Sequence, residues 1–402
     1  MSMPVPSCEY EELLYHSSLT TWDGVSKNYL RRVNGPYRSA VPPYIGDLAI
    51  VPSAKAAELI AEARVAAARV DQALRAAPYD LPSVLLRSES ASSSRIENLT
   101  VSAKGVALAQ IGRGDSKNAQ LNVANIKAME TALTQGSLTA DGMARIQHQL
   151  VEDETMQGIR TGPVWISNNR YGPRKAAFVP PQAERLRSYI EDLVAFADRN
   201  DLDPVLKAFV LHAQFETVHP FADGNGRVGR ALIHLVLREE GVAESSCLPL
   251  SAGLLADIGA YHSGLSAYRQ GDAEPLVCLM AQSLSAAAVA AAELKARMDN
   301  FLHEYEETVR ARSKSTAQRL GFLLVKMPAV NTSKVAQALG VSSEAASNAL
   351  RKAAQAGMLT QKGSGRATVY LCDRVLEAVD ETCRAIPLRH GAREQRWSSD
   401  SL

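Results

Sequence analysis

The 402-residue sequence lacks the features that would place the chain in a membrane or direct it out of the cell. Its longest apolar run, Ala286–Ala292, is far shorter than a membrane span. The first residues include Glu9, Glu11 and Glu12 and have neither the basic start nor the apolar centre of a signal peptide. Net charge is also nearly absent, with 44 Lys and Arg against 43 Asp and Glu, so no global field favours nucleic acid or membrane. We therefore expect a cytoplasmic protein with no membrane partner.

Cysteine is scarce, and its spacing excludes a disulfide framework or a cysteine-bound metal. The chain has five cysteines, an odd number, scattered and without metal-ligand spacing. We expect reduced, buried thiols, as in a cytosolic protein. They are Cys8, Cys247, Cys278, Cys372 and Cys383.

The pattern along the chain predicts a mainly α-helical protein. Its length is enough for about two or three domains. Residues 1 to 45 contain five prolines and look irregular. Apolar residues at helical spacing then dominate. The expected helices cover residues 54–77, 81–98, 117–135, 140–151, 182–198 and most of 250–310.

One segment before residue 320 predicts strands. Val164–Ile166 and Ala176–Val179 enclose a polar stretch that contains Gly172-Pro173, a pattern typical of a β-hairpin. The edge of such a hairpin offers backbone groups to an extended partner segment. A plain surface hairpin is the alternative.

Residues 219–230 carry the strongest signal and read His-Pro-Phe-Ala-Asp-Gly-Asn-Gly-Arg-Val-Gly-Arg. Asp203-Pro204 predicts the start of a helix that ends at His219. A second helix is predicted from Arg227 to Glu239. The glycine-rich turn therefore opens on a helix N-terminus, where unpaired N–H groups and the helix dipole favour an anion. The first helix is expected to bury one apolar face, made by Leu206, Phe209, Val210, Ala213 and Val218.

The side chains around this turn fit phosphate chemistry. Arg227 and Arg230 are three residues apart, and guanidinium groups there suit a polyphosphate. Asp223 could hold Mg²⁺ together with phosphate oxygens. His219 could deprotonate a hydroxyl that attacks the bound phosphate. The alternative is a helical corner with a capping histidine and surface arginines, which fits any one of these residues but not all of them together.

This segment resembles the signature of the Fic family, His-x-Phe-x-(Asp/Glu)-Gly-Asn-Gly-Arg-x-x-Arg, and matches it at every fixed position. The resemblance implies an all-helical core and an enzyme, a nucleotidyltransferase. Most members transfer AMP from ATP to a hydroxyl side chain (Ser, Thr or Tyr) of a target protein. A kinase relative of the Doc type carries lysine where this chain has Gly226, so the resemblance favours AMP transfer.

The resemblance also assigns roles to residues of the signature. His219 would be the general base, and Asp223 would hold Mg²⁺ between the α- and β-phosphates. Arg227 would contact the β-phosphate of ATP and Arg230 the γ-phosphate. The anion hole would be formed by Gly224, Asn225 and Gly226.

Outside the signature, the family's known parts match more loosely. The predicted hairpin would be the flap that pairs with the target, through Val164, Trp165, Ile166, Ala177 and Phe178. Tyr261 fits the tyrosine that often contacts adenine. Gly253 and Leu254 stand where an aromatic residue is common, which leaves the base pocket open.

Ser93 to Asn98 fits the family's inhibitory pattern, Ser/Thr-x-x-x-Glu-Gly/Asn, through Ser93, Glu97 and Asn98. A glutamate that reaches Arg230 would occupy the guanidinium that the γ-phosphate needs. ATP could still bind, but with its α-phosphate misplaced for attack. Two other readings stay open: a serine-rich helix end on the surface, and a Glu97 that also aligns a water to remove AMP.

The last third of the chain resembles a winged helix-turn-helix, a DNA-binding module. Helices are expected over Thr332–Leu339 and from Ser342 to Ala356, and strands at Leu359–Gln361 and Thr368–Leu371 would flank a wing. Between residues 314 and 372, eight basic residues face one acid, Glu344, which gives a net charge of +7. Such modules also serve in dimerisation or docking. The basic residues are Lys314, Arg319, Lys326, Lys334, Arg351, Lys352, Lys362 and Arg366.

Two functions from different classes follow. The first is an AMP transferase restrained by Glu97, with ATP and a target protein as partners. The second is a regulator that binds DNA through 314–372 and senses nucleotide with its Fic core; a homodimer is compatible with either. The expected parts are an N-terminal helical region (1–110), the catalytic core (111–300), a helical linker (301–313), the winged domain (314–385) and a disordered tail (386–402).

Overall fold

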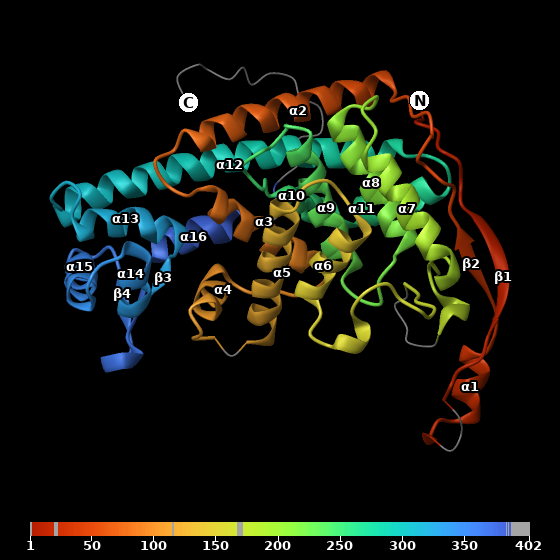
Figure 1. Cartoon of the computed structure of the whole chain (residues 1–402), viewed down its shortest axis with the longest axis horizontal. Coiled ribbons are helices and arrows are strands. Elements are labelled where there is room, and N and C mark those ends of the chain that lie inside the picture. The colour runs from red at the N-terminus through yellow and green to blue at the C-terminus, as the bar shows by residue number, and fades with distance from the viewer. Residues whose placement is uncertain are drawn as a thin grey trace. The chain divides into compact units, whose positions relative to one another are not determined.

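The computed structural model describes residues 2–19, 23–114, 116–166, 172–382, 384 and 386 (Figure 1). The chain divides into two compact units, each made of pieces that are distant in the sequence. The first unit contains residues 1–60, 131–239 and 259–279. The second contains residues 61–130, 240–258 and 280–402. The division into five parts that the sequence suggested stays a prediction.

The first unit begins with a two-stranded antiparallel sheet. Strand β1 (Glu9–Tyr15) pairs with β2 (Gly35–Val41), and helix α1 (Lys27–Val33) lies between them in the sequence. The prediction that residues 1 to 45 are irregular was therefore wrong. In a two-stranded sheet both strands are edges, and an edge strand tolerates proline, so Pro36 does not prevent pairing.

Helix α8 (Pro204–Val218) lies in the core of the first unit, with residues 205–218 buried. Asp203 caps its start by accepting a hydrogen bond from the Val205 N–H at 2.9 Å, as predicted. The five apolar residues expected to face inward are buried, which confirms the predicted buried helix, and the polar side chains of Lys207 and Gln214 are buried with them. Helices α7 (Leu186–Ala197) and α9 (Asn225–Glu239) pack against α8, and the first unit also contains α6 (Ala140–Leu150) and most of α11 (Ile258–Arg269).

The expected hairpin of residues 164–179 is much shorter than predicted. Ile166 and Phe178 form one antiparallel bridge, in which the Ile166 N–H donates to the Phe178 carbonyl at 2.9 Å. A short 3₁₀ helix, η3 (Pro173–Lys175), precedes Phe178, and Asn168, Asn169 and Arg170 lie outside the described residues. Pro163, Pro173, Pro180 and Pro181 lack the N–H groups that a longer ladder requires. We call residues 162–181 the flap segment.

The second unit contains the helix with the candidate inhibitory motif. This helix, α3 (Pro82–Ile96), is followed by α4 (Ala103–Gln110), which the sequence did not predict. The short α10 (Leu250–Leu254) belongs to the same unit. Three long helices have residues in both units: α2 (Ala54–Arg75), α5 (Lys117–Thr134) and α12 (Glu274–Val309).

The last part of the second unit combines helices with a small antiparallel sheet of order β3-β5-β4. Gly340, in the left-handed region at φ 62°, ends the first of the two predicted helices, and Ser342 caps the second. Both helices and both flanking strands occur within one or two residues of the expected bounds, whereas the other elements were not predicted. The assignment to the winged class stays a proposal. The elements are α13 (Thr316–Lys326), β3 (Ala329–Val330), α14 (Thr332–Leu339), α15 (Ser343–Gln355), β4 (Thr360–Lys362), β5 (Val369–Leu371) and α16 (Asp373–Thr382).

Helix α12 contains an 18-residue window with a mean hydropathy of 1.7, long and apolar enough to cross a membrane by length and composition. Of this window, 61% is buried within the protein, as in a core helix. Within the described residues, the cysteines are buried and form no disulfide, which agrees with the expected thiols. The cytoplasmic location stays a prediction.

Candidate active site

His219 lies at the end of the central helix of the first unit. Its backbone is in the left-handed region (φ 50°, ψ 62°), and its N–H donates to the Phe215 carbonyl at 2.8 Å. A residue with a side chain pays about 1–2 kcal/mol for this conformation, so the surroundings must hold it there. The imidazole is 19% exposed, with its Nδ1 atom 3.8 Å from a carboxylate oxygen of Glu216. His219 therefore lies at the edge of the core, next to the carboxylate of Glu216.

Arg160 holds the turn at His219 and was not identified from the sequence. Its Nε atom donates to the His219 carbonyl at 2.9 Å, Nη2 to the Pro181 carbonyl at 2.7 Å and Nη1 to the Gly162 carbonyl at 3.0 Å. Its main-chain N–H donates to the Pro220 carbonyl at 3.0 Å. Burial lowers the pKa of Arg160 to about 10, which still leaves it charged at neutral pH. One buried cation therefore ties both ends of the flap segment to the candidate general base.

The loop after His219 is closed by the side chain of Asn225. Its Oδ1 atom accepts the Phe221 N–H at 2.9 Å, and its Nδ2 atom donates to the Phe221 carbonyl at 2.8 Å. Gly224 is in the left-handed region at φ 88°. Helix α9 begins at Asn225, so the first N–H groups of the helix have no partner within it. The predicted anion hole, Gly224 to Gly226, lies at this helix start, and its role toward an anion stays a prediction.

Asp223 lies at the rim of the same loop. Its side chain is 56% exposed, and Oδ1 accepts the Gly224 N–H at 2.6 Å and lies 3.6 Å from the Arg227 guanidinium. The main chain at Asp223 is held by Gln147, a buried residue of α6 that the sequence did not reveal. Gln147 Nε2 donates to the Asp223 carbonyl at 3.3 Å and to the Met156 carbonyl at 3.0 Å.

This donor set fits Mg²⁺. In the part of the chain that the structure describes, no three His, Cys, Asp or Glu side chains gather into a metal site. Mg²⁺ needs no such group, because it is usually held by one or two carboxylates, phosphate oxygens and water. An exposed carboxylate directly before a helix start meets that requirement, and the Mg²⁺ site stays a prediction.

The two signature arginines are buried, which excludes the alternative of surface arginines. Arg227 is 5% exposed and Arg230 1% exposed. Beside Arg230 lies His212 of α8, whose pKa is lowered to about 3, first by burial and second by the charge of Arg230. Tyr261, the candidate adenine contact, is buried, and its hydroxyl lies 2.8 Å from His212 Nε2. Its role toward adenine stays a prediction.

Helices α8 and α9 approach closely at Gly229. A Cβ atom on Gly229 would lie 2.9 Å from Glu216 Oε1, 3.0 Å from Phe215 Cδ1 and 3.1 Å from His212 Nδ1. Real Cβ contacts are longer than this, so the absence of a side chain lets α9 approach the end of α8. Helix α9, which carries the two arginines, therefore lies directly against α8, which ends at the histidine.

The candidate inhibitory motif lies in the second unit, at the end of α3. Leu99 N–H donates to the Ser94 carbonyl at 3.0 Å and Asn98 N–H to the Arg95 carbonyl at 2.9 Å, the two bonds of a Schellman motif. Asn98 has φ 61°, the left-handed conformation that this motif needs. The left-handed backbone at Asn98 therefore explains why the inhibitory pattern requires Gly or Asn at this position.

The serines before this turn are buried, so the reading of a serine-rich helix end on the surface was wrong. Ser93 is fully buried, as are the serines at 88, 90, 92 and 94. Glu97 caps the helix and is exposed. Glu97 belongs to the second unit and Arg230 to the first, and their pairing stays a proposal.

Comparison with known proteins decides the family of this site. The Fic/DOC family matches residues 137–237, which include α6 to α8, most of α9, the flap segment, Gln147 and Arg160. The chain carries a Fic domain. A solved Fic family protein from Desulfovibrio desulfuricans aligns with a TM-score of 0.54 and 21% identity over 83% of this chain and 98% of that chain, which establishes the fold.

Two relatives of the Fic domain are named for an activity. A probable protein adenylyltransferase of Aquifex aeolicus is 42% identical over 69 residues, which are 17% of this chain and 21% of that protein. Protein adenylyltransferase fic-1 of Caenorhabditis elegans is 24% identical over 163 residues, 40% of this chain and 30% of that protein. This chain thus covers less than a third of either relative.

Proposed function

We propose that this protein is an adenylyltransferase that moves AMP from ATP to a Ser, Thr or Tyr hydroxyl of a target protein. The observation that carries the proposal is the complete signature of the Fic domain in one geometry. A histidine at the end of α8 and two arginines of α9 flank a loop that opens on a helix N-terminus. Relatives named protein adenylyltransferases support the reaction class.

In this proposal some residues bind the phosphates of ATP and one accepts the proton of the target hydroxyl. The N–H groups at the start of α9 bind phosphate oxygens, and Arg227 and Arg230 bind the β- and γ-phosphates. His219 takes the proton of the target hydroxyl, whose oxygen attacks the α-phosphorus as pyrophosphate leaves. When bound at Asp223, Mg²⁺ supplies positive charge to the phosphates.

The flap segment is proposed to place the target. Ile166 and Phe178 already pair with each other, and the Val179 carbonyl accepts the Ala40 N–H of β2 at 2.9 Å. An extended target segment could add to this backbone. Because Arg160 ties both ends of the flap segment to His219, a target held there would be aligned with the base.

Glu97 is proposed to restrain the reaction by competing with the γ-phosphate for Arg230. The Schellman turn at Asn98 fixes the end of the helix that presents Glu97, which supports a defined position for its carboxylate. Use of Glu97 to remove AMP is the alternative within the same site.

The test uses ATP labelled on its α-phosphate, with wild type, Glu97→Gly and His219→Ala. We expect weak self-labelling of wild type, stronger labelling of Glu97→Gly and none of His219→Ala. If no variant is labelled with any nucleoside triphosphate, the enzymatic proposal fails. Loss of a preformed label only when Glu97 is intact would favour the removal of AMP.

DNA binding is a second candidate function, favoured by the local charge of +7 between residues 314 and 372. The exposed side chains of α15 include Arg351 and Lys352. Affinity for random duplex DNA is expected to fall steeply with salt, and to weaken when both residues are changed to alanine. Binding that is unaltered in this double variant would exclude the helix as the contact.

A further inference from the structure

We propose that the second unit contains a binding site for a small sugar phosphate, separate from the ATP site of the Fic domain. The site is a cavity of about 410 Å³ beside the end of α3. Arg95 of α3 lines it, together with the residues that join α3 to α4, with Asp380 of α16 and with Arg384, which follows that helix. The other lining residues are Thr100, Val101, Ser102, Asp380 and Arg384.

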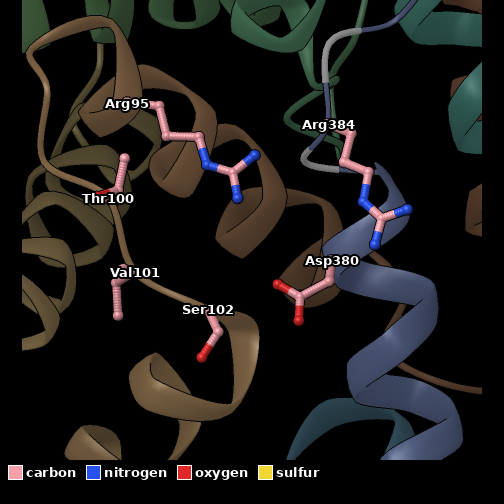
Figure 2. A pocket seen from close by; sticks show the side chains of 6 residues that line it. All are labelled: Arg95, Thr100, Val101, Ser102, Asp380 and Arg384. Atoms are coloured by element: carbon pink, nitrogen blue, oxygen red, sulfur yellow. The ribbon is translucent and has the colours of Figure 1, made fainter.

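Two guanidinium groups face this cavity from different elements. Figure 2 shows Arg95 reaching in from the end of α3, and Arg384 beside Asp380 on the opposite side. Guanidinium groups offer planar pairs of N–H donors that match phosphate oxygens. Since the lining has two cations and one acid, its net charge of +1 favours an anion.

The N-terminus of α4 at this cavity is already capped by Ser102 and Asp380. An anion would therefore be bound by the arginines and not by the N–H groups of the helix. Ser102 Oγ accepts the Gly105 N–H at 3.1 Å, and Asp380 Oδ1 accepts the Ala103 N–H at 2.7 Å. The Ser102 hydroxyl keeps a hydrogen to donate, because a serine hydroxyl is both donor and acceptor. The Asp380 carboxylate has further lone pairs that can accept hydrogen bonds from ligand hydroxyls.

The size and the lining together select the ligand class. The site is a hollow of about 410 Å³ that is open to solvent, so a bound ligand would keep one side exposed. A free phosphate would leave most of it empty. A phosphate monoester of a sugar presents oxyanion oxygens to Arg95 and Arg384 and hydroxyls to Asp380. None of these residues belongs to the signature of the Fic domain.

The test is titration calorimetry of the full chain with ribose 5-phosphate, ribose and inorganic phosphate. We expect ribose 5-phosphate to bind with one site per chain, ribose to give no signal, and inorganic phosphate to bind more weakly. Arg384→Ala and Arg95→Ala are each expected to weaken the binding of ribose 5-phosphate at least tenfold. Thermal melting of each variant checks that it is folded; Arg384 is exposed, so its variant is the safer of the two.

Two control variants separate this site from others. Arg69→Ala changes an exposed arginine of α2 that does not line the cavity, and it should leave binding unchanged. Arg227→Ala impairs the proposed ATP site and should also leave binding unchanged. The proposal is overturned if ribose 5-phosphate does not bind, if both cavity variants bind it normally, or if Arg227→Ala abolishes its binding.

Discussion

Replacement of Arg160 by methionine should loosen the turn that carries His219. Methionine fills a similar volume but removes three hydrogen bonds of 2.7–3.0 Å to the carbonyls of His219, Gly162 and Pro181. A buried polar group left without a partner costs about 1–3 kcal/mol. Removal of the buried cation returns part of its own desolvation cost, so the net loss in the free energy of unfolding should be about 3 kcal/mol.

Arg160→Met should lower the activity by more than the loss of folded protein explains. Since the backbone of His219 is held in the left-handed region by its surroundings, a looser turn misplaces the imidazole, and a shift of about 1 Å can cost roughly 10²-fold in rate. The assay is self-labelling in the Glu97→Gly background under conditions where the variant is folded. We expect kcat to fall and KM for ATP to stay nearly constant, because Arg160 is not among the residues proposed to bind phosphate.

Arg174→Met is the matched control. Arg174 also donates to two carbonyls, those of Arg31 and Asn34, at 3.2 and 3.3 Å, but it is exposed. Its replacement should change stability by less than about 0.5 kcal/mol. An Arg160→Met variant that is as stable and as active as Arg174→Met would contradict the role of Arg160 in holding His219.

Three further substitutions test the packing, the helix end and the buried histidine. Gly229→Ala should destabilise the fold by about 1–3 kcal/mol in urea unfolding, because its Cβ would press on α8; an unchanged midpoint would contradict the close approach. Asn98→Gly should keep the stability of the protein while Asn98→Val lowers it by about 1–2 kcal/mol, since only the first accepts φ 61° easily; equal stability of the two variants would contradict the Schellman turn. His212 has its folded pKa lowered to about 3, so the unfolded chain takes up its proton first as the pH falls below about 6.5. Stability from this residue is complete above pH 6.5 and should fall by about 2–3 kcal/mol between pH 6.5 and 4.5, and unfolding curves of His212→Gln should lack this component.

The parts of the site that the sequence predicted are those with local signals. Asp203-Pro204 marks a helix start by capping and by the fixed φ of proline, and the residues of the signature lie within twelve positions of each other. The helix end at His219 and the second helix were predicted from these local signals, although the second helix begins at Asn225 rather than at the predicted Arg227.

The residues that the sequence missed act over long range through the backbone. Arg160 and Gln147 bind carbonyl groups of segments far along the chain, and such contacts leave no periodic pattern in the sequence. The sheet of β1 and β2 was missed because prolines suggested loops, although an edge strand tolerates them. The hairpin at residues 164–179 was predicted too long, because prolines lack the N–H groups that its hydrogen-bonded ladder would need at its ends.

The transfer of AMP itself is tested most directly by the position of the label in ATP. Glu97→Gly would be incubated in parallel with ATP labelled on the α-phosphate and with ATP labelled on the γ-phosphate. We expect protein-bound label from the α-phosphate alone, and loss of this label when His219→Ala is added. Label from the γ-phosphate would instead show kinase chemistry and contradict the assignment of AMP transfer.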